Sequence, residues 1–318
     1  MPHLLLTGSS GFVGSHLQRR FTEMGWRVTG IGQRALDQEG YIRHDLSQPL
    51  PDNLGPFDAV VHAAARSSPW GRRSDFHRQN VVATRNVIDY CREHGQPKLI
   101  FVSSLSVYYR PLDQFNITES TPLADRGANE YASSKIKAES LVQQYPGTWA
   151  ILRPRSVFGP GDTVLFPRIL RAARAGKLPL LTRPGDPTMG DMIYIDNFTD
   201  HVAATVTNPT IQGCFNLTNH ETVPILAFLL DVLKRLDIPL PTKKVSVRTA
   251  WMAAWALEHF YALCLPNREP PLTRFGVHIL AYSKTFDVTK MLATFGPPRI
   301  SLTDGVSAFV ESVKASGS

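Results

Sequence analysis

A glycine-rich turn near the start of the chain constrains its fold more than any other feature. The sequence TGSSGFVG, at residues 7–14, follows the apolar run Leu4–Leu6 and opens a helical pattern. Gly8 permits a tight turn, Gly11 lets the backbone approach a pyrophosphate, and Gly14 lets the helix pack closely on the sheet. The N-terminus of that helix offers unpaired N–H groups to an anion. The pattern therefore predicts a dinucleotide-binding strand–turn–helix unit.

Short apolar runs and helical patterns alternate through the first half of the chain. We expect strands at Leu4–Leu6, Val28–Ile31, Ala59–His62, Leu99–Ser103 and Ala150–Arg153, a further short strand ending in His44-Asp45-Leu46, and helices at Val13–Met24, Asn80–His94 and Tyr131–Gln144. This alternation predicts an α/β, Rossmann-type, doubly wound parallel sheet. Proline and glycine become frequent after Pro154. We therefore expect a dinucleotide-binding domain at 1–158, to which 191–217 returns, and a smaller, irregular substrate-binding lobe at 159–190 and 218–318.

Composition excludes several classes of protein. The 318 residues are 43% hydrophobic and 19% charged, which is a globular composition. The net charge is 34 − 27 = +7, but the basic residues are scattered in runs of at most two, so we expect no nucleic-acid partner. Three isolated cysteines argue against a disulfide framework or a zinc site and suit a reducing compartment. With no signal-peptide pattern, a cytoplasmic location is expected.

The end of the second expected strand bears on the choice of cofactor. An acidic residue there binds the ribose 2′-hydroxyl of NAD in dinucleotide-binding folds. This chain has Gly32 at that point and Arg34 two residues later, and Arg34 can pair with the 2′-phosphate of NADP. We therefore favour NADP(H), with NAD(H) as the alternative. Further along, Asp45 can accept from the adenine amino group, and the small residues Ala63, Ala64 and Ala65 leave room for a cofactor.

Tyr131 and Lys135 are spaced four residues apart, so they share one face of a helix. The charge of Lys135 can lower the pKa of the Tyr131 phenol and make it an acid and base near neutral pH. Ser104 ends an apolar strand, where its hydroxyl can hydrogen-bond a substrate oxygen. We expect no metal: His62 packs at its strand end, without further ligands at a useful spacing.

These motifs resemble those of the extended short-chain dehydrogenases/reductases. The resemblance covers nearly the whole chain and rests on TGSSGFVG at 7–14, DAVVHAAA at 58–65, SSLSVY at 103–108, YASSK at 131–135 and LRPRSVFGPGD at 152–162. It implies that Ser104, Tyr131 and Lys135 are the catalytic residues and that Asn80 contacts the cofactor. The full set of expected cofactor-binding residues is Gly8, Ser10, Gly11, Phe12, Val13, Gly14, Arg34, Asp45, Leu46, Ala63, Ala64, Ala65, Asn80, Ser103, Tyr131, Lys135, Pro154 and Val157.

The C-terminal region is similar to one branch of that family. Residues 269–275, EPPLTRF, and 280–288, LAYSKTFDV, resemble the 3β-hydroxysteroid dehydrogenase branch, which includes sterol-carboxylate dehydrogenases and 2-alkyl-3-oxoalkanoate reductases. The resemblance implies an oxidoreductase that interconverts a ketone and a secondary alcohol on an apolar, sterol-like or 3-oxoalkanoate substrate. One alternative is a nucleotide-sugar epimerase. The other is a non-catalytic, NADP-binding regulatory protein. Dehydration is disfavoured, since Leu105-Ser106 replaces the acidic pair of dehydratases.

The second lobe is rich in aromatic residues, which we expect either to close an apolar pocket over the nicotinamide or to form the core of the lobe itself. They are Phe166, Trp251, Trp255, Phe260, Tyr261, Phe275 and Tyr282. For the stretch Trp251–Leu265 we favour core packing or a substrate lid over contact with a membrane surface. By analogy with the family, Asn80–His94 and Tyr131–Gln144 could form a four-helix homodimer interface.

Overall fold

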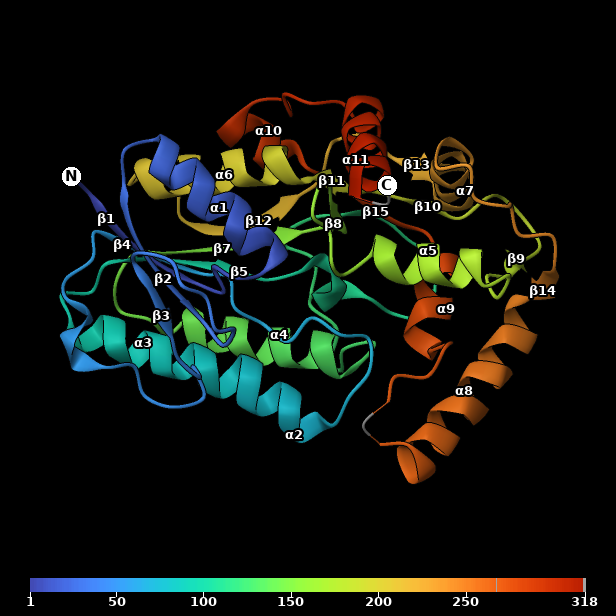
Figure 1. Ribbon diagram of the computed structural model, residues 1–318, viewed down its shortest axis with the longest axis horizontal. Helices are drawn as coiled ribbons and strands as arrows, with labels where there is room; N and C mark the ends of the chain where they lie inside the picture. Colours follow the sequence, from blue (N-terminus) through green and yellow to red (C-terminus); the bar gives the residue numbers. More distant parts are fainter. Residues whose placement is uncertain (267, 317–318) are drawn as a thin grey trace.

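A seven-stranded parallel sheet forms the centre of the molecule, as the computed structural model shows for residues 1–266 and 268–316 (Figure 1). Its strands, in spatial order, are β12 (Gly213–Leu217), β7 (Trp149–Pro154), β5 (Lys98–Val102), β4 (Ala59–His62), β1 (His3–Thr7), β2 (Arg27–Gly32) and β3 (Tyr41–Arg43). The predicted Rossmann-type fold is confirmed. The strand order reverses between β1 and β4, and ligands of such sheets bind at that crevice, beyond the carboxyl ends of the strands.

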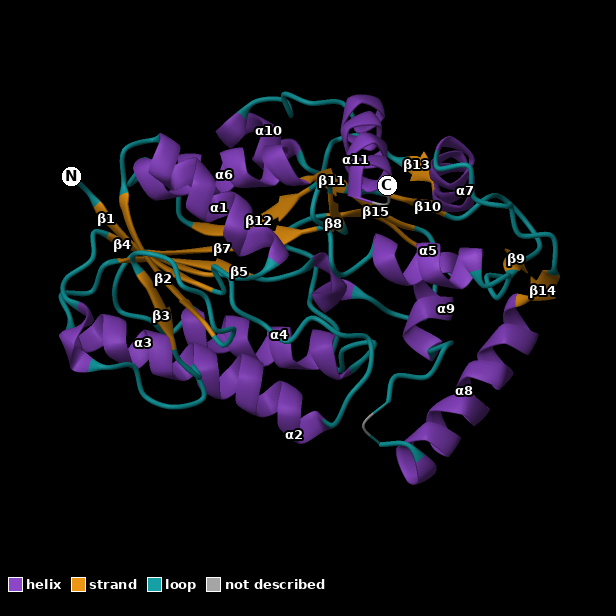
Figure 2. Cartoon of the chain, viewed as in Figure 1, coloured by secondary structure: helices purple, strands orange, loops and turns teal. Residues whose placement is uncertain are grey.

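Helices cover both faces of the sheet (Figures 1 and 2). One layer contains α1 (Phe12–Glu23), α6 (Ile195–Thr207) and α10 (Thr289–Phe295); the other contains α2 (Arg73–Phe76), the π-helical segment η2 (His77–Val82), α3 (Ala83–Glu93) and α4 (Glu130–Val142). Each helix layer packs on one face of the sheet and forms a separate apolar core with it. Leu17 and Phe198 belong to the first core, and Val87 and Ala138 to the second. Both faces of the sheet are therefore buried, which explains why its strands read as apolar runs.

The second lobe combines short strands and helices around a third core. Its helices are α5 (Phe166–Arg174), α7 (Ile225–Arg235), α8 (Val247–Cys264), α9 (Arg274–Ala281) and α11 (Leu302–Ser316). A four-stranded sheet has the order β13 (Val223–Pro224), β10 (Met189–Gly190), β15 (Lys284–Phe286) and β6 (Gln114–Ile117). Two further pairs are β11 (Ile193–Tyr194) with β8 (Val157–Phe158), and β14 (Lys244–Ser246) with β9 (Leu180–Thr182). Short 3₁₀ helices are η1 (Asp52–Leu54) and η3 (Leu105–Tyr108).

Some elements differ from the sequence-based expectations. The helix expected at Asn80–His94 starts earlier, at Arg73, and passes through the π-helical turn η2. The third strand, β3, ends at Arg43, before Asp45. Of the segment 191–217, β12 joins the main sheet, whereas β11 pairs with β8 outside it. The division into two domains stays a proposal.

Helix α8 projects from the second lobe and packs on α9 (Figure 1). Ala250 and Ala254 are buried against that neighbour, but Trp255 is 51% exposed and Phe260 is 53% exposed. The expected core packing is therefore wrong for these two aromatic residues, because they lie on the outer face of the helix. No helix in the described part of the chain is both long and apolar enough to span a membrane.

Candidate active site

The glycine turn after β1 forms a close backbone cradle. Gly8 has a φ of +75°, and a Cβ there would lie 2.7 Å from backbone atoms of Ala64. A Cβ on Gly14 would lie only 2.0 Å from the carbonyl oxygen of Gly8. Gly11 caps α1 with extended backbone. Because these positions admit no side chain and the helix N-terminus faces the turn, the residues fit a dinucleotide pyrophosphate.

Gly32 occupies the position at the end of β2 where NAD-binding folds carry an acidic residue. A Cβ on Gly32 would lie 2.5 Å from Oγ of Ser10 and 2.7 Å from the hydroxyl of Tyr41. The exposed Arg34 donates from Nη1 to the Ser10 carbonyl oxygen, at 2.9 Å. The guanidinium therefore lies beside the phosphate-binding turn, and its contact with a 2′-phosphate stays a proposal.

Two further arginines, which the sequence analysis missed, lie near Asp45. Oδ2 of Asp45 accepts from Nη1 of Arg78 at 3.3 Å, and Arg43 donates from Nε to the Gln33 carbonyl oxygen at 3.2 Å. The carboxylate of Asp45 also accepts a hydrogen bond from the Ser47 backbone N–H, and this bond holds the pKa of Asp45 below its usual range. Arg43, Asp45 and Arg78 help to line a cavity of about 480 Å³ at the ends of β2 and β3. Their convergence depends on tertiary structure, because Arg43 ends β3 and Arg78 lies in η2, far along the chain.

Buried polar contacts hold the segment after β4. His62 is fully buried, and its ring nitrogens lie 2.7 Å from the Thr7 hydroxyl and 3.0 Å from the Thr84 hydroxyl. This matches its expected packing role. Asn80 is also buried; it accepts from the Arg66 N–H at 2.7 Å and donates to Oγ of Ser134 at 2.8 Å. Asn80 thus ties the loop after Ala63–Ala65 to α4, and its cofactor contact stays a prediction.

The other expected cofactor-binding residues lie around the same sheet edge. Phe12 and Leu46 are buried in apolar cores, and Val13 and Val157 pack partly against them. Pro154 is the last residue of β7. The hydroxyl of Ser103 donates to Oε1 of Glu139 at 2.5 Å. Because the hydroxyl of Ser103 donates to this buried carboxylate, we expect Ser103 to contact a cofactor through its backbone.

The structure brings Ser104 and Tyr131 together. Tyr131 lies in the first turn of α4, where the Ser104 side chain is near enough to its phenol to lower the phenol's pKa. Ser106, which the sequence analysis used only as an argument against dehydration, donates to Oγ of Ser104 from its own hydroxyl at 3.0 Å and from its backbone N–H at 3.2 Å. These bonds orient the Ser104 hydroxyl at the start of η3. The arrangement places two hydroxyl groups where one substrate oxygen could meet both.

Lys135 lies one helical turn after Tyr131 and is only 2% exposed. Its Nζ donates to the Val102 carbonyl oxygen at 2.7 Å and lies 4.5 Å from the centre of the Phe101 ring. Burial lowers the pKa of Lys135 to about 7, although the Glu139 carboxylate opposes this shift. A lysine with so low a pKa at a sheet edge is typical of functional sites.

The expectation that Lys135 lowers the pKa of Tyr131 is wrong for this structure. Burial raises the pKa of the phenol to about 12, and the nearby Ser104 side chain offsets only part of that rise. Desolvation of Tyr131 therefore outweighs the effect of Ser104, and the charge of Lys135 is not among the causes of the shift. At neutral pH the phenol is protonated and can donate a proton.

A buried ion pair between Arg153 and Glu139 holds the elements that carry these residues in place. Nε and Nη2 of Arg153 donate to Glu139 at 3.0 and 2.6 Å. Nη1 of Arg153 also donates to the Tyr108 hydroxyl. Glu139 thus joins α4 to β7, and through Ser103 it reaches the end of β5. The network fixes the helix that carries Tyr131 and Lys135 relative to the strand that leads to Ser104.

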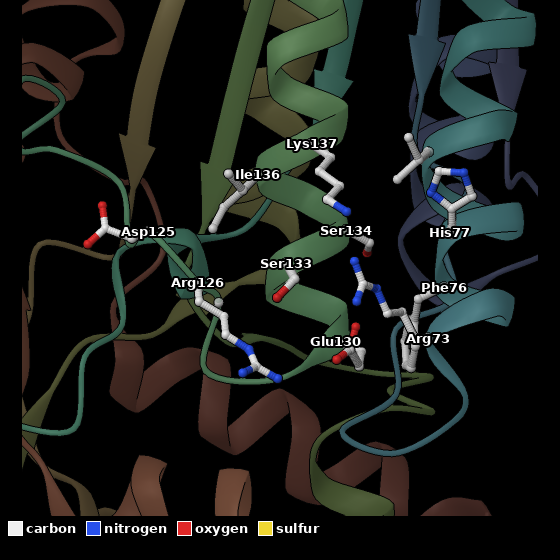
Figure 3. Close-up of a pocket in the computed structure, with 12 residues that line it drawn as sticks. Arg73, Phe76, His77, Asp125, Arg126, Glu130, Ser133, Ser134, Ile136 and Lys137 are labelled. Carbon is white, nitrogen blue, oxygen red and sulfur yellow. The ribbon is translucent and has the colours of Figure 1, made fainter.

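A cavity of about 490 Å³ lies between α4 and the segment formed by α2 and η2 (Figure 3). Arg73, Arg126, Glu130 and Lys137 help to line it. Glu130 and Lys137 come from α4, Arg73 comes from α2, and Arg126 comes from the loop before α4. A homodimer through this surface would have to bury several charges, and the dimer interface stays a proposal.

The aromatic residues of the second lobe do not all share one pocket. Phe166 is fully buried in the lobe core, where its ring lies 4.5 Å from that of Phe309. Trp255 and Phe260 face outward, whereas Trp251 and Tyr282 pack against the small core of α8 and α9. Phe166 therefore belongs to the core of the lobe, which was the alternative, whereas a role of Trp255 and Phe260 in closing a substrate pocket stays a prediction.

The fold and these motifs define an extended short-chain dehydrogenase/reductase. The model of the NAD dependent epimerase/dehydratase family matches residues 4–217. The chain belongs to this family and is an NAD(P)-dependent enzyme.

Several known proteins are similar over almost the full chain. The 2-alkyl-3-oxoalkanoate reductase of Shewanella oneidensis is 33% identical over an alignment of 328 positions, which covers 96% of this chain and 84% of that protein. The reductase of the same name from Stenotrophomonas maltophilia is 30% identical, covering 95% and 97%. The decarboxylating sterol-4-alpha-carboxylate 3-dehydrogenase of Mus musculus is 28% identical, covering 96% and 89%.

Solved structures also match over their full length. MoeE5 in complex with UDP-glucose and NAD has a TM-score of 0.77 at 21% identity and covers 99% of this chain and 100% of that one. UDP-glucuronic acid 4-epimerase from Bacillus cereus, in complex with NAD, has a TM-score of 0.74 at 20% identity, covering 98% and 99%. At this identity the likeness establishes the shared fold alone.

Proposed function

We propose that the protein is an NADP(H)-dependent oxidoreductase that interconverts a ketone and a secondary alcohol on an apolar substrate. The observation that carries the proposal is the approach of the Ser104 side chain to the Tyr131 phenol, with Lys135 buried one turn further along α4. The names of the sequence relatives support a 3-oxoalkanoate or a sterol-like substrate.

The chain's own residues handle the substrate oxygen and its proton. Ser104 holds that oxygen by a hydrogen bond, and Tyr131 donates its proton to the same atom as negative charge develops there. A phenol with a pKa of about 12 is in the protonated form that reduction requires. The bound nicotinamide supplies the hydride. Lys135 binds the ribose, and the glycine turn at 7–14 holds the pyrophosphate.

The preference for NADP(H) rests on Gly32 and Arg34. With no carboxylate at the end of β2 and a guanidinium beside Ser10, we expect NADPH to bind more tightly than NADH. One charge-assisted contact corresponds to a preference of about 10- to 150-fold. Fluorescence titration of both cofactors tests this, with Arg34→Ala as the probe and Arg126→Ala, in the loop before α4, as the matched control. Equal affinities in the unmodified protein would overturn the Arg34 assignment.

A series of 3-oxo acids of growing alkyl length tests the substrate. Each buried methylene should raise kcat/KM about fourfold, from about 0.8 kcal/mol, until the apolar space is filled. The assay follows NADPH absorbance, and the same assay is run with UDP-sugars.

The nucleotide-sugar epimerase alternative is favoured by the structural neighbours alone. A flat chain-length profile together with turnover or tight binding of a UDP-sugar would establish it. Cofactor binding without turnover of any of these compounds would instead indicate the non-catalytic regulatory role.

A further inference from the structure

Two cations lie buried close to the carboxyl-end edge of the sheet without an acidic partner. Arg155, the residue after β7, is 5% exposed, and Lys284, in β15, is 1% exposed. Among residues 1–266 and 268–316, neither has a carboxylate oxygen within 4.0 Å. Buried charges in proteins are normally paired, because removing an ion from water costs free energy.

Arg153, two residues before Arg155, shows how this chain pairs a buried guanidinium. Arg153 gives two hydrogen bonds to Glu139, whereas Arg155 gives one bond, from Nη1 to the neighbouring Ser156 hydroxyl at 2.8 Å. Nε of Arg155 is buried and has no hydrogen-bond partner. Ser156 itself adopts a φ of +44°, a strained conformation of the kind that clusters at functional sites. Arg155 is therefore held in place with donor capacity to spare.

Lys284 and a buried histidine meet Arg155 around one aromatic ring. The Arg155 guanidinium lies 5.1 Å and the Lys284 ammonium 5.7 Å from the centre of the Tyr109 ring. His278, from α9, stacks on the same ring at 5.8 Å, and its Nε2 is buried without a partner. Lys284 donates from Nζ to the Leu112 carbonyl oxygen at 2.5 Å. Three nitrogen-bearing side chains thus converge from distant parts of the sequence.

The acids near this cluster leave a positive charge in excess. Asp191 accepts from the Thr222 hydroxyl at 2.5 Å and from the Phe286 N–H at 3.0 Å. Asp113 accepts from both Nη atoms of Arg183, at 2.9 and 2.7 Å. Counting Arg155, Arg183 and Lys284 against these two acids leaves one unbalanced cation. Consistent with this, burial and the charges of Lys284 and Arg155 lower the pKa of His278 to about 4.

The cluster adjoins the candidate catalytic residues. β5 and β7 are neighbouring strands in register at Val102 and Leu152, so Ser104 and Arg155 leave the sheet at the same edge. Ser104 caps the start of η3, and Tyr109 caps its end. A substrate whose oxygen meets Ser104 could therefore extend a second group toward Arg155.

We propose that Arg155, Lys284 and His278 form a buried anion subsite that binds the carboxylate of the substrate. The planar guanidinium fork matches the two oxygens of a carboxylate, Lys284 adds charge, and a neutral His278 can donate one N–H. Only the assignment of the anion to the substrate rests on the proposed oxidoreductase function.

Calorimetric binding of decanoate, methyl decanoate and sulfate tests the subsite without turnover. Decanoate should bind about 10- to 150-fold more tightly than its uncharged ester, and Arg155→Met should abolish that difference. Lys284→Met provides a second variant, in case the first fails to fold. Arg171→Met, at an exposed arginine of α5, is the matched control and should keep the difference. Equal binding of acid and ester, or loss of the preference in Arg171→Met rather than Arg155→Met, would overturn the proposal.

Sulfate distinguishes a free-anion site from a substrate site. If sulfate competes with decanoate at equal affinity, the subsite binds a free anion, and the substrate assignment is wrong. In the turnover assay, the ratio of kcat/KM for a 3-oxo acid to that for its methyl ester should fall by the same factor in Arg155→Met. Absence of turnover with both compounds, while the binding preference persists, would contradict the proposed function but leave the anion subsite standing.

Discussion

Replacing Lys135 with methionine should change how the stability of the protein depends on pH. Burial lowers the pKa of Lys135 from 10.5 to about 7, so between these values the unfolded chain binds a proton that the folded chain does not. Stability therefore rises with pH in this window. Integrated between pH 7 and pH 10, the contribution of this one group changes by roughly 3 to 4 kcal/mol. Methionine has a similar length and no charge, so the variant loses that dependence.

Urea unfolding of both proteins at pH 7 and pH 10 measures the effect. The stability of Lys135→Met relative to the unmodified protein should be higher at pH 7 than at pH 10, by roughly 3 to 4 kcal/mol. Lys137→Met, at an exposed lysine of the same helix, is the control and should shift stability equally at both pH values. A pH-independent difference for Lys135→Met would show that the ammonium is not desolvated as described, and the reasoning would fail.

Two further predictions concern packing. Glu139→Gln should lower the free energy of unfolding by about 3–5 kcal/mol, because it leaves the Arg153 charge buried and unpaired, whereas the double variant Glu139→Leu/Arg153→Met should recover most of the loss; denaturant titration showing under about 1 kcal/mol for the single change would refute this. Trp255→Ala should alter stability by less than about 0.5 kcal/mol, since that side chain is half exposed, while Trp251→Ala, whose side chain packs on the small core, should cost more; the same titration would contradict this if the order were reversed.

The elements that depend on local sequence were predictable. Gly8 and Gly14 are required because the turn after β1 leaves no space for a Cβ, and this demand shows in any dinucleotide-binding sequence. Ser104 and Tyr131 were found for a similar reason: a strand end and a helix position place them at one edge of a parallel sheet. Patterns along the chain carry this information directly.

The properties that arise from burial could not be predicted. The sequence places Lys135 and Tyr131 on one helix face, but their pKa values follow from desolvation, which depends on packing by distant segments. The side of α8 that packs inward is likewise set by α9, so periodicity alone could not place Trp255 outside. Arg155 and Lys284 both lie over the Tyr109 ring, although the three residues are far apart in the chain. No local sequence pattern predicts this contact.

Tyr131→Phe tests the central claim most directly. The variant keeps the ring and its packing but removes the proton that the substrate oxygen is proposed to receive. With a 3-oxo acid and NADPH at neutral pH, kcat should fall by about 10²- to 10⁴-fold while the Kd for NADPH changes little. Turnover within about tenfold of the unmodified protein would contradict the assignment of Tyr131 as the proton donor, and with it the reaction proposed for this site.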